Sequence, residues 1–135
     1  PAGNRRRGSV HINETTGVIK VKTTNRESSE WNCLGALAWA RYSGNAQAVR
    51  KSFNVAGIVR NSTGNYTVTL SDDLVFANTN DFCVNVTSSQ PITTVGNPAL
   101  DGDGHLSFEV DTESAIGTPA NSGFINIVVY GVTSN

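Results

Sequence analysis

The sequence contains no methionine, only two cysteines and no long apolar run. No apolar stretch approaches the roughly 20 residues of a transmembrane helix, so membrane insertion is not expected. Because methionine is missing even at position 1, we expect a processed product or a piece of a longer protein. We favour a C-terminal piece, because the last strand pattern continues almost to the final residue. The apolar fraction of 38% and the charged fraction of 16% over 135 residues are typical of one folded domain.

Lysine and arginine are absent from the second half of the chain. All ten lie in residues 5–60 beside three acids, a net charge of +7, whereas residues 61–135 carry the other eight acids, a net charge of −8. A basic half can bind nucleic acid, but no basic patch interleaved with aromatic residues accompanies it. We therefore expect no nucleic-acid partner, and two halves that neutralise each other within one chain or between chains.

Residue types that carry catalysis are also sparse. His11 and His105 are the only histidines. The sequence has neither a nucleophile elbow nor a Cys/His set with zinc-binding spacing. Asp72 and Asp73 are adjacent acids, and glycoside hydrolases use a pair of carboxylates. Neighbouring acids in a turn, however, are usually exposed to solvent. We expect no enzymatic activity and no cofactor.

The two cysteines, Cys33 and Cys83, both lie in apolar runs. We expect them to be small buried side chains with free thiols. A disulfide that joins them is the alternative, and it requires their Cα atoms to lie close together in the fold.

Alternation of apolar and polar residues predicts two β-hairpins. One spans residues 9–22, and the other spans residues 52–70, where Gly64 supplies the positive φ that ends its turn. Residues 56–57 interrupt the alternation of the second hairpin, which indicates a β-bulge.

The apolar run 31–42 favours a strand buried on both faces, although a helix is also compatible with it. Trp39, inside this run, is expected to fill the core. The remaining pattern predicts strands at 81–87, 105–111 and 124–130, the last of them central, with long loops at 88–104 and 112–123. About eight short strands are typical of a sandwich or barrel, and we expect an all-β fold, an antiparallel β-sandwich.

Three ordered segments, AWARY (38–42), SFNV (52–55) and GNYTV (64–68), form a pattern that DFCV (81–84), SFEV (107–110) and VYG (129–131) continue. In this order and spacing, residues 33–131 resemble a module common near the C-termini of bacteriophage tail fibres and related virion proteins. Asp81 departs from the Asn that is usual there, and the first 30 residues lie outside the resemblance.

The resemblance implies an all-β domain at the tip of a virion fibre. It implies a homotrimer that attaches the virion to a glycan or protein receptor on the host cell surface. On this interpretation residues 1–30 form a hairpin and connection continuous with an upstream fibre, and residues 31–135 form the sandwich at the tip. Display of several copies would raise avidity for the receptor.

The candidate receptor-binding residues are Trp31, Asp101, Asp103 and His105. Trp31 precedes an apolar strand and is able to stack on a sugar ring. The two aspartates lie in LDGDGHL (100–106), which is similar to the middle of a calcium loop. The first and last ligand positions of such a loop fall on Ala99 and Val110, however, so no metal site is expected.

The Asn, Thr and Ser side chains of the two predicted loops, 88–104 and 112–123, would suit hydrogen bonding to a glycan. Two other functions stay open at the level of sequence. One is a structural virion protein, either a capsid decoration or a fibre-trimerisation cap. The other is a monomeric carbohydrate-binding module.

Overall fold

The computed structural model describes residues 10–22 and 31–134, and it describes side chains for residues 10–20 and 35–134. This part of the chain is all-β and antiparallel, with no helix, which confirms the predicted fold class. Its twelve strands are β1 (Val10–Ile12), β2 (Ile19–Lys22), β3 (Trp31–Leu34), β4 (Ala38–Ser43), β5 (Ala48–Phe53), β6 (Val55–Ser62), β7 (Asn65–Leu70), β8 (Phe82–Ser88), β9 (Ile92–Leu100), β10 (Leu106–Ala115), β11 (Thr118–Pro119) and β12 (Ile125–Gly131).

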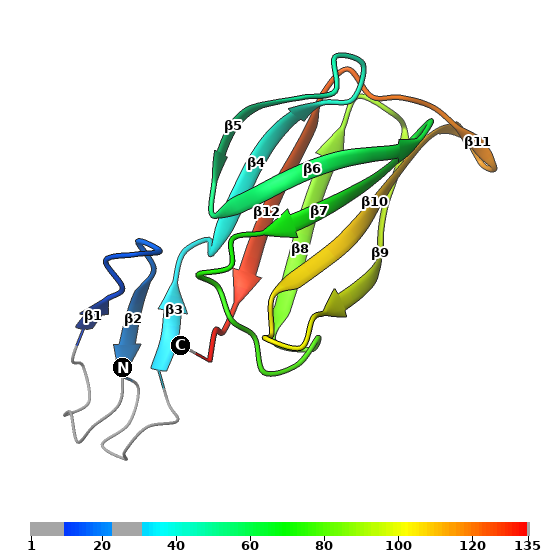
Figure 1. Ribbon diagram of the computed structural model, residues 1–135. Helices are drawn as coiled ribbons and strands as arrows, with labels where there is room; N and C mark the ends of the chain where they lie inside the picture. The colour runs from blue at the N-terminus through cyan, green and yellow to red at the C-terminus, as the bar shows by residue number, and fades with distance from the viewer. Residues whose placement is uncertain (1–9, 23–30, 135) are drawn as a thin grey trace.

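The strands form three sheets, of which the two larger ones face each other as a sandwich (Figure 1). Sheet I has the order β5-β4-β12-β8. Sheet II has the order β6-β7-β10-β9, with the short β11 paired to the end of β10. The N-terminal sheet, β1-β2-β3, lies beside the end of the sandwich where the chain terminates (Figure 1). In sheet I the closing strand β12 lies between β4 and β8, so its predicted central position is confirmed.

The core forms because alternate residues of each strand point between the sheets. On β7 and β10 the buried positions alternate with half-buried polar ones. Strands β4 and β12 present their own buried positions from the other side. The fully buried hydrophobic residues of these four strands are Ala38, Tyr42, Tyr66, Val68, Leu70, Leu106, Phe108, Val110, Ile125, Ile127 and Val129.

Strands β6 and β7 form the predicted hairpin, and Gly64 has the expected positive φ of 74°. The predicted bulge is present as a register shift between Val55 and Gly57. The predicted hairpin began at residue 52, but its first two residues belong to another sheet, because Phe53 is the last residue of β5 in sheet I. Asn54, with a φ of 54°, turns the chain into sheet II, and its side-chain amide donates to the carbonyl oxygens of Thr16 and Leu37 at 2.7 and 2.8 Å.

The interpretation of residues 31–42 as one strand buried on both faces is wrong. Gly35, with a φ of 78°, separates β3 in the N-terminal sheet from β4 in sheet I. Strand β4 buries one face only, and Trp39 lies on the other face with 40% of its surface exposed. Ala38 and Ala40 occupy the core positions instead.

The two predicted long loops are also largely strand. Residues 92–100 form β9, which pairs along β10, and β10 itself continues to Ala115 before β11. The Gly and Pro of this segment are tolerated because β9 lies at the edge of sheet II, where a missing N–H breaks no ladder. Cys83 lies on β8 as a free thiol, which agrees with the prediction, but it is exposed, so its expected burial is wrong.

Strands β1 and β2 form the other predicted hairpin, and the N-terminal sheet gains β3 as its third strand. Val18 belongs to the core cluster, and the buried Lys20 donates from Nζ to the carbonyl oxygen of Thr133 at 3.0 Å. These contacts tie the N-terminal sheet to the sandwich. The described residues include no helix with the length and apolar character needed to cross a membrane.

Candidate binding surfaces

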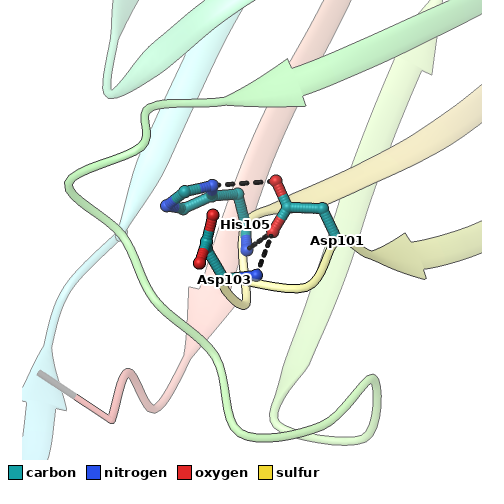
Figure 2. Close-up of side chains that lie close together, drawn as sticks. All are labelled: Asp101, Asp103 and His105. Atoms are coloured by element: carbon teal, nitrogen blue, oxygen red, sulfur yellow. Dashed lines mark hydrogen bonds and ion pairs between the residues drawn. The ribbon is translucent and has the colours of Figure 1, made fainter.

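Three of the four predicted site residues lie together in the turn between β9 and β10 (Figure 2). Asp101, Asp103 and His105 place one ligand atom each within 4.8 Å of one another. Trp31, the fourth, begins β3 in the N-terminal sheet, and its side chain lies outside the described part of the structure. We refer to residues 101–105 as the Asp101 turn.

Hydrogen bonds to one carboxylate hold the Asp101 turn in shape (Figure 2). Oδ1 of Asp101 accepts the backbone N–H groups of Asp103 and His105 at 2.9 and 3.0 Å. Its Oδ2 lies 2.9 Å from Nδ1 of the His105 ring. An aspartate that binds the backbone ahead of it is a common way to build a tight turn, so the local sequence explains this geometry.

The segment that follows β7 supports the turn from its outer side. The N–H of Phe76 donates to the carbonyl oxygen of Gly104 at 2.9 Å, and Gly104 has a positive φ of 86°. A Cβ atom at Gly104 would lie 2.8 Å from the carbonyl oxygen of Phe76, so the close approach requires glycine here. Asp72 from the same segment brings its carboxylate within 3.9 Å of the His105 ring.

The contacts shift two pKa values in opposite directions. The pKa of Asp101 lies below its usual 3.8, chiefly because the carboxylate accepts the backbone N–H of His105. The pKa of His105 lies above its usual 6.5, chiefly because the ring hydrogen-bonds Asp101, with the charges of Asp101, Asp72 and Asp103 adding to the effect. A protonated His105 therefore completes an ion pair with Asp101.

The Asp101 turn satisfies its own hydrogen bonds and is a poor cation cage. Both oxygens of Asp101 and the Nδ1 atom of His105 already have partners. Calcium takes six to eight oxygen ligands, and this turn offers side-chain oxygens from Asp101 and Asp103 only. The geometry fits a preorganised turn that presents Asp103 and the imidazole edge to solvent.

Parts of the two predicted loops meet at the opposite end of the sandwich. Gln90 donates from its side-chain amide to the carbonyl oxygen of Asn121 at 2.7 Å, and the hydroxyls of Ser89 and Ser122 lie 2.9 Å apart. Beyond them the β10–β11 hairpin projects from the sandwich, away from the Asp101 turn (Figure 1). We refer to residues 89–91 together with 116–123 as the hairpin end.

Ile116 is the outstanding side chain of the hairpin end, because 93% of its surface is exposed. It lies in the turn between β10 and β11, where the N–H of Gly117 donates to a carboxylate oxygen of Glu113 at 3.0 Å. This segment was predicted to be part of a loop, and Ile116 was not among the predicted site residues. The sequence does mark Ile116, since it is an apolar residue that stands before glycine in a polar segment, a pattern typical of an exposed turn.

The outer face of sheet I is a second surface that sequence reasoning missed. Trp39 and Tyr130 are each 40% exposed there. The guanidinium of Arg41 lies 5.3 Å from the centroid of the Phe124 ring. On β4 the alanines occupy the buried phase, and Trp39 and Arg41 alternate with them on the outward phase.

Comparison with known proteins adds no relative. No protein-family model matches the sequence. No curated protein and no solved structure shows significant similarity to it.

Proposed function

We propose that the protein is a noncatalytic receptor-binding domain at the tip of a virion fibre, displayed as a homotrimer. It would attach the virion to a glycan or protein receptor on the host cell surface. The single observation that carries this proposal is the hairpin end, where hydrogen-bonded loops hold an almost fully exposed Ile116 at one end of a rigid sandwich.

The chemistry of the hairpin end suits recognition. Binding residues are often found on loops that a rigid scaffold positions. The hydrogen bonds of Ser89 and Gln90 to residues 121 and 122 fix these loops before any partner arrives, which lowers the entropy lost on binding. Amide and hydroxyl groups next to an exposed apolar residue would bind a sugar through both its polar and its apolar faces.

The resemblance to fibre modules gives the proposal its biological setting. Its motif residues 38–42, 65–68 and 107–110 lie in β4, β7 and β10, which belong to the two facing sheets, and Gly64 lies in the turn before β7. The noncatalytic assignment is supported by the Asp101 turn. In it one oxygen of the Asp101 carboxylate accepts the backbone N–H groups of Asp103 and His105, and the other oxygen bonds the Nδ1 atom of His105.

Labelling of cells tests the proposal. The purified domain, carrying a fluorophore on its N-terminal amine, is incubated with a panel of bacterial strains. We expect at least one strain to be labelled, and we expect Ile116→Asp to abolish the labelling. The matched control is Ile12→Asp, which adds the same charge at an exposed isoleucine of the N-terminal sheet. Equal labelling by wild type and Ile116→Asp would contradict the assignment of the hairpin end.

Two other results would redirect the assignment. A domain that forms trimers but labels no strain would favour a structural virion protein, either a capsid decoration or a fibre-trimerisation cap. A monomer that binds defined oligosaccharides on a glycan array would favour a solitary carbohydrate-binding module.

A further inference from the structure

Seven charged side chains on the strands of the sandwich lie on different surfaces according to their sign. Strands β4 to β6 carry four cations, and the outward positions of β10 carry three acids. None of these seven side chains makes an ion pair with another described residue. They are Arg41, Arg50, Lys51, Arg60, Glu109, Asp111 and Glu113. Neutralisation of the two halves within one chain, one of the two sequence-based expectations, is therefore not observed for them.

The cations on sheet I are placed where a counter-charge is needed. Arg41 and Lys51 lie directly opposite each other on β4 and β5, and both are exposed. Like charges in a directly opposed pair destabilise a sheet. An anion supplied from outside the chain would relieve this repulsion.

The acids of β10 form a negatively charged strip on sheet II, opposite in sign to the cations on sheet I. Glu109 and Asp111 project from the outer face of sheet II, because they alternate along β10 with Phe108 and Val110, which are buried in the core. Their carboxylates accept side-chain amides at 2.7 Å, Glu109 from Asn97 and Asp111 from Asn65. These amides orient the carboxylates but leave their charge uncompensated.

Sheet I also offers an apolar centre beside its cations. Trp39 precedes Arg41 by two residues on the same outward phase of β4, and it pairs with Phe53 on β5 and with Val128 on β12. Trp, Tyr and Arg are enriched in protein–protein interfaces, whereas surface salt bridges alone contribute little. An aromatic centre flanked by cations is therefore a suitable surface for a protein partner with acidic side chains.

We propose that the outer face of sheet I around Trp39, Arg41 and Lys51 binds the Glu109–Asp111–Glu113 strip on β10 of a second copy of this chain. The two surfaces lie on opposite sheets, so each copy can use both at once. The contact is heterologous, and it closes into a ring or continues as a filament according to the rotation between copies. Burial of about 800 Å² on each partner would give a stable contact.

This inference rests on the self-association in the proposed function and not on receptor binding. Its failure and the failure of attachment are therefore distinguishable. Solution mass tests the contact between copies, and cell labelling tests attachment.

Light scattering at two protein concentrations is the first measurement. We expect a mass near three times 14.3 kDa if the contact closes into a ring, or a mass that grows with concentration if it stays open. A monomer at both concentrations would overturn the inference.

Charge reversal identifies the surfaces. The sheet I variant Arg41→Glu/Lys51→Glu and the β10 variant Glu109→Lys/Asp111→Lys should each weaken association more than about 100-fold, because like charges then face each other. Trp39→Thr should also weaken it without changing any charge. A control variant, Glu14→Lys/Asp72→Lys, makes the same charge change as the β10 variant at exposed sites off both surfaces and should keep the wild-type mass.

The decisive variant carries both reversals in one chain. A heterologous contact predicts that this fourfold variant recovers the wild-type mass, because each reversed surface again meets its complement. A fourfold variant that stays monomeric while it keeps the wild-type circular dichroism spectrum and thermal midpoint would overturn the inference. So would association that persists in both single-surface variants.

Discussion

The ring of Tyr66 on β7 meets the ring of Tyr42 on β4 edge to face, with centroids 5.5 Å apart and an angle of 72° between the planes. The pair joins the two sheets of the sandwich at the hairpin end. The hydroxyl of Tyr66 donates to Oδ1 of Asn121 and accepts the backbone N–H of the buried Ser122, both at 3.3 Å. Burial and the neighbouring Tyr66 raise the pKa of Tyr42, which therefore stays neutral.

Replacement of this hydroxyl should destabilise the fold. Tyr66→Phe leaves the buried N–H of Ser122 without its partner, and an unsatisfied buried donor costs about 1–3 kcal/mol. Denaturant unfolding measures the loss. Tyr130→Phe, at an exposed position of β12, is the control and should stay within about 0.5 kcal/mol of wild type. Equal stability of Tyr66→Phe and wild type would show that water replaces the hydroxyl.

Two glycines with the same backbone conformation allow the cost of a left-handed backbone to be measured apart from the cost of a Cβ atom that collides with its neighbours. Gly64 and Gly117 have φ values of 74° and 75°. A Cβ atom at Gly64 would collide with the carbonyl oxygen of Thr112, whereas a Cβ at Gly117 meets nothing within 4 Å. Gly117→Ala should cost about 1–2 kcal/mol from the left-handed backbone alone. Gly64→Ala should cost clearly more, and similar unfolding free energies for the two variants would contradict the collision.

The Asp101 turn should give a pH-dependent contribution to stability. His105 has a raised pKa, so its contribution is complete below pH 6.5 and is lost as the pH rises through the folded-state pKa. Asp101 has a lowered pKa, so its contribution is complete above pH 3.8 and is lost as the pH falls through the folded-state pKa. The turn should therefore stabilise most between these two values.

Titration by NMR measures this directly. We expect the His105 imidazole to titrate above 6.5 in the wild type and to move down in Asp101→Asn, which removes the charge but keeps the size of the side chain. The difference between the thermal midpoints of the two proteins should be largest between pH 3.8 and 6.5. It should narrow at higher pH, where the charge of His105 is lost but the backbone hydrogen bonds to the Asp101 carboxylate remain. An unchanged imidazole titration in Asp101→Asn would show that the hydrogen bond between the side chains does not cause the shift.

Calcium should leave the protein unchanged. The oxygens of Asp101 are already bonded, and the turn offers too few further oxygens for this ion. We expect the same thermal midpoint with calcium and with a chelator. A midpoint that rises with calcium and falls with chelator would contradict this and would identify a bound ion. Asp103→Asn would then test whether the turn supplies a ligand.

Patterns confined to neighbouring residues were predictable from the sequence. The alternation of Tyr66, Val68 and Leu70 located β7 and its buried face, because a strand turns successive side chains to opposite sides. Gly64 fixed the end of the preceding turn for an equally local reason, its freedom to adopt a positive φ. The shape of the Asp101 turn has an equally local cause, because the Asp101 carboxylate accepts backbone N–H groups two and four residues ahead of it.

Long-range pairing decided what local patterns could not. Residues 92–100 contain Gly96 and Pro98 and were expected to be a loop, yet β10 pairs with them as an edge strand. Trp39 was expected in the core because its whole segment is apolar, but sheet I placed the alanine phase inward. In the first case the paired residues lie up to 21 positions apart in the chain, from Ile92 to Glu113, and in the second the deciding contacts come from the facing sheet.

The sequence by itself determined the all-β class, the two hairpins and the phase of the strongly alternating strands, because these depend on neighbouring side chains and on backbone φ. Only the tertiary structure decided which face of β4 is buried, which loops meet at the hairpin end, and that the cations and acids lie on separate surfaces. The physical reason is that these features depend on how the sheets stack. Stacking is set by the sum of many contacts between residues far apart in the chain.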